Sequence, residues 1–378
     1  MVAGSNLDRV YTSNDSGRTW QNNQLISKYG VYGDPCIVAG GANRFYYFHL
    51  SNYKKGTWID RIVCQRSDDG GKTWNEGSYT GLNGVKNQDK HWVFLLPGKK
   101  NDTLYVAWTQ FDKYNSAAVG DSSAIMFSAS YDNGKNFSQP LKISYYKGDC
   151  LDGDNTVEGA VPAVHPDGTL LVAWAGPKGL VFNRSNDKGK TFENQERLIC
   201  AMPGGWDISV KGLFRANGLP VLVCDRSNGP FSGRFYACWA EDRSIENNPD
   251  IWICHSDDKG NSWSRPSKIN RDNSAAAQFM PWVCVSEETG KVYVIYYDRR
   301  ESGTTEETAI WMGCSNDGGQ NFSERKISRG SFLPDSKVFF GDYLNITCSK
   351  GLVRPIWMEA NGEKLSIHTL LMNEGDIP

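Results

Sequence analysis

Short runs of apolar, β-branched and aromatic residues recur along the whole chain, with Gly, Asn or Asp between them. The stretch from 92 to 143 shows the pattern clearly, with runs at 92–96, 104–108, 124–129 and 140–143. Four such runs with turn residues between them are typical of a four-stranded antiparallel sheet. The pattern therefore predicts an all-β chain built from repeated four-stranded units.

A polar octapeptide stands between the third and fourth run of most units. It is written S-x-D-x-G-x-T-W, and its six copies begin at Ser13, Ser67, Ser130, Ser185, Ser256 and Ser315 and end at Trp20, Trp74, Phe137, Phe192, Trp263 and Phe322. The Ser and Asp side chains can bond nearby backbone amides, the Gly can take a positive φ, and the aromatic can pack under the loop. Six copies at intervals of roughly 55 to 70 residues indicate an internal repeat of the propeller or solenoid type.

This octapeptide resembles the Asp box, or BNR repeat, of sialidases and related β-propellers, and the resemblance covers nearly the whole chain. It implies a β-propeller fold. Because the copies spread evenly and no linker separates them, we expect a single propeller domain over residues 1–378. Asp boxes also occur in lyases, other glycosidases, sorting receptors and binding modules, so the resemblance specifies function less sharply. The box aspartates are structural in that family, and no chemistry is assigned to them.

The number of blades depends on how the two ends of the chain are counted. Five units are complete. A leading piece has runs at 2–4 and 10–12, and a trailing piece without a box has runs at 343–347, 353–357 and 365–368. Each piece holds about three strands, which is too many for one shared blade. We therefore predict seven blades, with six as the alternative, and a long loop or an added strand in the widest interval, 192–256.

The composition bears on whether the protein binds nucleic acid or crosses a membrane. A formal net charge of −2 with 22% charged residues provides no basic surface for nucleic acid. The sequence also contains no run of about 18 apolar residues, the length needed to span a membrane. The chain opens inside a predicted strand without a signal segment, so we expect a secreted or periplasmic protein from which an upstream segment has been removed, acting as a monomer.

The ten cysteines include no C-x-x-C pair, so a metal knuckle or redox motif is not expected. Buried free thiols are the favoured interpretation, and Cys150 and Cys200, in loop-like stretches, are the candidates for a disulfide. No metal-ligand spacing is present and no cofactor is predicted, although a Ca²⁺ ion held by loop carboxylates and carbonyls stays open.

Strand direction sorts the loops onto two faces. In a four-stranded antiparallel unit, the turn after strand three lies on the same face as the turn after strand one, so all Asp boxes share one face. The loops that lead into strand one and those that join strands two and three lie on the opposite face, where propellers usually bind ligands. These loops are rich in ionisable and aromatic residues, and we expect them to converge on one pocket.

Three carboxylates are the candidate catalytic residues: Asp89, Glu158 and Asp342. Glu158 precedes an apolar run, where partial desolvation would raise its pKa and suit it to acid or base catalysis. Asp89 forms a polar cluster with Lys90 and His91, so a structural ion pair is the alternative to a general acid. Asp342 follows a glycine at the start of a strand, where capping of the turn is the alternative.

The candidate substrate-binding residues lie in the same set of loops: Asp34, His91, Trp92, Trp206, Arg299, Arg300 and Tyr343. Trp92, Trp206 and Tyr343 would stack on sugar rings. Arg299 and Arg300 alternate in direction along a strand, so one would face the channel and the other would pair outward with a carboxylate such as Glu301. Turn capping is again the alternative for Asp34.

Carboxylates, arginines, a histidine and aromatics in one concave site are the groups that saccharide chemistry needs. We predict a glycoside hydrolase acting on an anionic or terminal sugar, with Asp89 and Glu158 as the carboxylate pair and an arginine as anion binder. The sialidase resemblance would also imply an F-R-I-P motif, an arginine trio and a tyrosine nucleophile. No F-R-I-P occurs here and no trio is evident, so a true sialidase is not favoured.

Two alternatives remain. Some other seven-bladed propellers, among them rhamnosidases and uronate lyases, use a central histidine, and resemblance to them would give that role to His91 or His49 and make the reaction an elimination. The other alternative is a non-catalytic carbohydrate- or protein-binding propeller, in which the central carboxylates would all be held in ion pairs.

Overall fold

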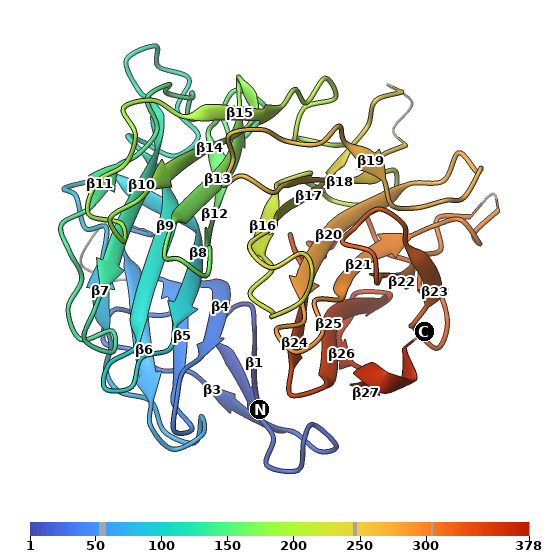
Figure 1. Ribbon diagram of the computed structural model, residues 1–378, viewed down its shortest axis with the longest axis horizontal. Helices are drawn as coiled ribbons and strands as arrows, with labels where there is room; N and C mark the ends of the chain where they lie inside the picture. The colour runs from blue at the N-terminus through green and yellow to red at the C-terminus, as the bar shows by residue number, and fades with distance from the viewer. Residues whose placement is uncertain (53–57, 245–247, 304, 378) are drawn as a thin grey trace. The chain divides into compact units, whose positions relative to one another are not determined.

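The computed structural model describes residues 1–52, 58–244, 248–303 and 305–377, and these residues form seven β-sheets (Figure 1). Within this part of the chain there is no α-helix, and the one helical segment is the 3₁₀ turn η1 (Glu374–Asp376). No helix among the described residues is long and apolar enough to cross a membrane. The predicted all-β class and the favoured count of seven blades are confirmed.

The strands follow one another along the chain in sheet order. The first three sheets hold β1 (Val2–Ser5), β2 (Arg9–Thr12) and β3 (Gln21–Gln24); β4 (Gly33–Ala39), β5 (Phe45–Leu50), β6 (Ile62–Ser67) and β7 (Ser78–Thr80); and β8 (Asn87–Leu96), β9 (Thr103–Phe111), β10 (Ser123–Ser130) and β11 (Leu141–Lys142). The fourth and fifth hold β12 (Glu158–Val164), β13 (Leu170–Gly176), β14 (Gly179–Ser185) and β15 (Arg197–Cys200), then β16 (Val221–Cys224), β17 (Phe235–Glu241), β18 (Asp250–Ser256) and β19 (Ser267–Lys268). The last two hold β20 (Gln278–Val285), β21 (Val292–Asp298), β22 (Ala309–Ser315) and β23 (Ser323–Lys326), then β24 (Asn345–Ser349), β25 (Leu352–Asn361), β26 (Lys364–Thr369) and β27 (Met372–Asn373).

The chain divides into two compact units. Unit 1 comprises Met1–Pro162, Val172–Pro177 and Phe182–Arg197, and unit 2 comprises Ala163–Leu171, Lys178–Val181 and Leu198–Pro378. The single domain over 1–378 stays a prediction. In the widest interval between boxes, the extra residues form a loop over 201–220 and not an added strand.

Each Asp box is a closed hydrogen-bonded turn before the last strand of its sheet. In the second box, Ser67 Oγ donates to Asp69 Oδ1 over 2.8 Å and accepts the Gly71 amide over 2.8 Å. The same carboxylate accepts the Thr73 amide over 2.9 Å and the Thr73 hydroxyl over 2.6 Å. These donors lower the pKa of Asp69 to about 2. The equivalent bonds recur in the other five boxes, so the box aspartates are engaged in the fold.

The first strands of several sheets carry a bulge of one extra residue near their start. Registers shift between Gly33 and Cys36 in β4, between Asp89 and Trp92 in β8, and between Phe279 and Trp282 in β20. In each case the residue after the first of the pair has a positive φ, at Asp34 (52°), Lys90 (47°) and Met280 (50°). Gly159, next to Glu158 at the start of β12, also has a positive φ, of 74°. Such bulges re-aim the side chains beside them.

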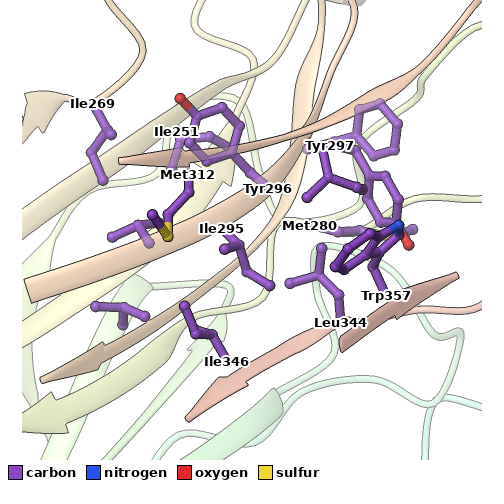
Figure 2. Close-up of a cluster of buried hydrophobic side chains, with 14 of the residues drawn as sticks. Ile251, Ile269, Met280, Ile295, Tyr296, Tyr297, Met312, Leu344, Ile346 and Trp357 are labelled. Atoms are coloured by element: carbon purple, nitrogen blue, oxygen red, sulfur yellow. The ribbon is translucent and has the colours of Figure 1, made fainter. Parts of the chain in front are cut away.

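Large apolar side chains from consecutive sheets fill the core of each unit. In unit 2, one apolar cluster contains buried side chains from strands that include β17, β21 and β25. Ile295, Tyr296 and Tyr297 of β21 belong to it, together with Leu344 and Trp357 (Figure 2). In unit 1, the second strand of each four-stranded sheet carries a fully buried aromatic residue, as in Phe48 and Trp108. These side chains explain the apolar runs from which the strands were predicted.

All ten cysteines are free thiols in this structure. Cys150 is buried and Cys200 is half-buried, and they are not joined to each other. The favoured interpretation, thiols packed as small hydrophobes, describes them.

Candidate functional site

In unit 1, the register of β8 and β9 brings Asp89 and Glu158 into one neighbourhood. Asp89 lies opposite Thr109 across these two strands. The Thr109 hydroxyl donates to the Val157 carbonyl over 3.2 Å, and the Val157 amide donates to Ser123 Oγ over 3.1 Å. The start of β12 is thereby fixed against the strand that faces Asp89. Hydrogen bonds of the backbone next to Glu158 thus hold it in the same region as Asp89, the other member of the predicted carboxylate pair.

Glu158 is a buried carboxyl group without a hydrogen-bond donor. Its side chain is 1% exposed, and neither Oε1 nor Oε2 accepts a hydrogen bond. Burial raises the pKa of Glu158 well above its usual range, and the like charges of Asp152 and Asp89 raise it further. The neighbour that approaches its side chain is the Asp152 carboxyl, which can share a proton with it but cannot donate when ionised.

Asp89 is half-buried and accepts the Lys90 amide over 2.8 Å. Burial raises the pKa of Asp89 to about 8, the nearby Asp34 and Asp152 carboxylates act in the same direction, and the Lys90 cation opposes them. Asp34 is held by its backbone, since its amide donates to Asn6 Oδ1 over 2.9 Å. The Asp34 carboxylate is close enough to raise the pKa of Asp89. This is what we expect if the loops of unit 1 that carry these residues converge.

Two members of this cluster were not predicted from the sequence. Asp152 lies in a tight loop, closed by bonds from Thr156 to Asp149 (2.9 Å) and to the Gly153 carbonyl (2.7 Å). The Tyr114 hydroxyl donates to Asp152 Oδ2 over 2.6 Å. Burial raises the pKa of Tyr114 far above its usual range, and Asp152 adds to the effect, so Tyr114 is a neutral donor. The only signal in the sequence was the density of aspartates at 149–154.

His91 and Trp92 pack into the sheets and not onto an open surface. His91 is 2% exposed, with its ring 6.4 Å from that of Phe48, and burial lowers the pKa of His91 to about 3. Trp92 packs against the apolar cluster of the second and third sheets. His49 is also buried, with contacts to the Leu50 carbonyl (2.8 Å) and to Gln65 Oε1 (3.2 Å). These positions favour structural roles, and substrate binding by His91 and Trp92 stays a prediction.

In unit 2, Asp342 is held by an arginine that the sequence did not single out. Arg215 Nε and Nη2 donate to the two oxygens of Asp342 over 2.7 and 2.5 Å, in a bidentate pair. Asn217 donates to the Asp342 carbonyl over 2.9 Å. Tyr343 is half-buried and Trp206 is 5% exposed. These contacts favour the structural alternative for Asp342, whose convergence with the unit 1 carboxylates stays a prediction.

Arg299 and Arg300 lie just beyond the end of β21 at Asp298, so the strand alternation predicted for them does not apply. Arg300 donates to Asp298 over 2.8 Å and to Glu324 over 2.7 Å, so its outward partners are these residues and not Glu301, which pairs with a lysine. Arg299 is 6% exposed and donates to the Lys211 carbonyl, while its Nη2 has no hydrogen-bond partner. Burial lowers the pKa of Arg299 to about 10. Arg299 is therefore the arginine with a donor to spare.

Among the described residues, no group of three or more His, Cys, Asp or Glu side chains is arranged to hold a metal ion. Asp34, Asp89, Asp152 and Glu158 together form the carboxyl cluster of unit 1.

Comparison with known proteins finds a matching repeat and similar folds. The BNR/Asp-box repeat profile matches residues 65–76, which include the whole of the second box. The NanB sialidase from Streptococcus pneumoniae, solved in complex with 2-[(3-chlorobenzyl)ammonio]ethanesulfonate, has a similar fold, with a TM-score of 0.54 at 13% identity over 97% of this chain and 70% of that one. The chain is an Asp-box β-propeller with the sialidase-like fold.

Solved structures with other activities share this propeller fold. The α-L-arabinofuranosidase of Fusarium graminearum, in complex with arabinobiose, has a TM-score of 0.59 at 13% identity over 90% of this chain and 93% of that one. An ulvan lyase, a polysaccharide lyase, has a TM-score of 0.56 at 9% identity over 100% and 85%. No curated protein sequence matches the propeller. At such identities the likeness establishes the fold, and the activity has to be argued from the site.

Proposed function

We propose that this propeller is a glycoside hydrolase in which Glu158 is the proton donor. The observation that supports this most is that Glu158 is buried, receives no hydrogen bond and lies beside two other carboxyl groups. A carboxyl group in such surroundings keeps its proton at neutral pH, and a protonated carboxyl is what cleavage of a glycosidic bond needs at the leaving oxygen. The structural neighbours act on sialosides, arabinosides and ulvan, so carbohydrate is the substrate class that the fold favours.

Asp89 is the second carboxylate of the proposed pair. In its ionised form it would either attack the anomeric carbon or activate a water molecule, while Glu158 protonates the departing oxygen. Because the pKa values of Asp89 and Glu158 are both raised, the two carboxyl groups titrate together, and the active form holds one proton, on Glu158. The kcat/KM of the hydrolase should therefore have a bell-shaped dependence on pH, falling when Asp89 takes up a proton and when Glu158 loses one.

Hydrolysis accounts for the site better than the alternatives. Elimination by a histidine is less favoured, because both ring nitrogens of His49 already contact the Leu50 carbonyl and Gln65 Oε1, and His91 packs against the ring of Phe48. A binding module would hold its central carboxylates in ion pairs, as Arg215 holds Asp342, but Glu158 has no such partner. We also propose that the enzyme works outside the cytoplasm, where polymeric glycans are met.

The test is an activity screen of the purified protein on arabino-oligosaccharides, sialyllactose and ulvan between pH 6 and pH 9, roughly the interval around the raised pKa values. Released monosaccharide would be measured by chromatography and unsaturated product by its ultraviolet absorbance. We expect monosaccharide release, and we expect Glu158→Gln to lower kcat at least about 100-fold, the typical contribution of a general acid.

Glu196→Gln is the matched control. Glu196 is also a buried glutamate of unit 1, but it accepts the amides of Tyr145 and Tyr146 over 2.7 and 3.1 Å. This variant should keep its kcat even if it loses stability. Unsaturated product, or full turnover in Glu158→Gln, would reject the proposal.

A further inference from the structure

Trp58 is an exposed aromatic residue on the loop that precedes β6. Its side chain is 39% exposed, although two tyrosines pack edge-on against it. The ring of Tyr32 lies 5.2 Å away at 90°, and that of Tyr114 lies 5.6 Å away at 82°. The three rings together form an aromatic surface in unit 1, which we call the Trp58 surface.

The backbone under this surface is held in place by several contacts. Ile59, the next residue, is fully buried and has a φ of 49°, a conformation that β-branched residues rarely adopt. Asp60 is 3% exposed and accepts bonds from Ser51 Oγ (2.9 Å) and Arg61 Nε (2.7 Å). These contacts fix the backbone that carries the exposed indole, so the indole is held in a defined position.

Asn87 connects the loop that carries Trp58 to the loop that carries Tyr114. Its Nδ2 donates to the Trp58 carbonyl over 2.8 Å, and its Oδ1 accepts the Tyr114 amide over 3.0 Å. Phe111, which is 0% exposed, packs 5.0 Å from Tyr114 and covers the apolar core beneath. The exposed face of Trp58 is therefore not needed to close the core.

Tyr114 also links the surface to the carboxyl cluster. Its ring packs on Trp58, while its hydroxyl donates to Asp152, whose carboxyl approaches Glu158. Two residues, Tyr114 and Asp152, thus connect a sugar ring stacked on Trp58 to the group proposed to protonate the glycosidic oxygen. Aromatic faces bind the C–H faces of sugars because both surfaces are apolar and flat.

We propose that the Trp58 surface is a subsite for an uncharged sugar ring adjoining the bond that is cleaved. The proposal rests on the proposed hydrolase and adds the substrate class, a neutral glycan. Asp152 is in contact with this surface, because it accepts the Tyr114 hydroxyl. A sialic or uronic acid at this subsite would approach the Asp152 carboxylate, and the two like charges would repel.

The test is binding of labelled glycans on a microarray that holds neutral and acidic oligosaccharides. The probe proteins are the unsubstituted chain, Trp58→Ala and Tyr131→Ala. Tyr131 is the matched control, an aromatic residue of unit 1 that is 44% exposed but lies in an Asp box. We expect neutral glycans to be retained by the unsubstituted chain and by Tyr131→Ala, and to bind Trp58→Ala at least about tenfold more weakly.

Three outcomes would overturn the subsite: preference for acidic glycans, equal binding by Trp58→Ala, or no binding to any spot. Glu158→Gln keeps the test separate from the proposed reaction, since it should bind the array like the unsubstituted chain while hydrolysing nothing. If the array binds through Trp58 and no bound glycan is ever cleaved, the hydrolase is rejected and the subsite stands.

Discussion

Glu158 and Glu196 are both buried glutamates of unit 1, and their surroundings give them opposite properties. Glu196 accepts two backbone amides, which suit a carboxylate, whereas Glu158 accepts none and lies among like charges. The sequence alone marked Glu158 through its place before an apolar run. It could not supply the charges around it, because Asp152 and Tyr114 come from loops without any periodicity.

Asp152 gives a direct test of how this cluster sets its own titration. Its negative charge raises the pKa of both Asp89 and Glu158, so Asp152→Asn should lower both values. The two limbs of the pH profile of kcat/KM should then move together to lower pH. A profile measured on the best substrate of the screen checks this prediction.

Asp154→Asn is the control for that profile, because Asp154 is exposed and lies on the same loop. It should leave both limbs in place. Limbs that stay fixed in Asp152→Asn, or that move equally in both variants, would show that Asp152 does not act on the pair.

Other residues were beyond sequence reasoning for a different reason. Arg215 and Asp342 form a bidentate pair although they are 127 residues apart, and no local pattern marks either as the partner of the other. Trp58 was likewise not distinguished from the other twelve tryptophans, of which the predicted stacking residue Trp206 is 5% exposed. Exposure of an aromatic ring is a property of packing.

At the scale of elements, strands were predicted well because each is an apolar run bounded by turn residues. The runs at 104–108 and 124–129 became β9 (Thr103–Phe111) and β10 (Ser123–Ser130). The bulges were not predicted, because one extra residue changes the register without changing the composition of the run.

Trp108 and Trp174 test the contribution of one hydrogen bond at equivalent places in β9 and β13. Both are fully buried, but Trp108 Nε1 donates to Gln88 Oε1 over 2.6 Å, while Trp174 Nε1 has no partner. Trp→Phe should leave similar cavities at both sites. Trp108→Phe should lower the free energy of unfolding by about 1–3 kcal/mol more than Trp174→Phe, because it leaves the buried Gln88 oxygen unsatisfied.

Chemical denaturation of the two variants measures that difference. Adding Gln88→Met to Trp108→Phe removes the unsatisfied oxygen and should bring the two losses closer together. Equal losses for the single variants would mean that the indole hydrogen bond contributes nothing net.

At the scale of the whole molecule, the internal repeat was enough to predict the fold. Because every sheet repeats the same order of strands and six of them the same turn, counting strands at the two ends was enough to favour seven blades. The division into two compact units was not predicted, since its boundaries fall inside β12, β13, β14 and β15, where the sequence reads like any other blade.

Buried histidines should make the stability of the protein sensitive to acid. Burial lowers the pKa of His91 to about 3 and that of His49 to about 4, from an ordinary value of 6.5. Below pH 6.5 His49 and His91 bind protons in the unfolded chain but not in the folded protein. Their contribution to the free energy of unfolding is therefore lost as the pH falls towards the lowered pKa values. The histidine contribution to the Tm should therefore decrease across this interval, while the raised pKa values of Asp89 and Glu158 act in the opposite direction, so it is measured as the difference from a variant that lacks the ring.

His91→Leu should reduce this acid sensitivity, because it replaces a ring that makes no hydrogen bond through its nitrogens with an apolar side chain among apolar neighbours. Its Tm near pH 7.5 should equal or exceed that of the unsubstituted chain, and its loss on acidification should be smaller, as calorimetry across the interval about 4 to 7.5 would measure. An unchanged slope would contradict the assignment of a neutral buried ring.

The single-residue bulges have a consequence for how such a protein can change its specificity. Gly33, Asp89 and Phe279 occupy corresponding positions just before the extra residue, and the side chains after it resume the packing of the blade. Gly33 has a φ of 134° and Phe279 is fully buried, so substitution at either position should destabilise its sheet. A change of specificity that keeps the fold therefore has to come from loop residues outside the bulges.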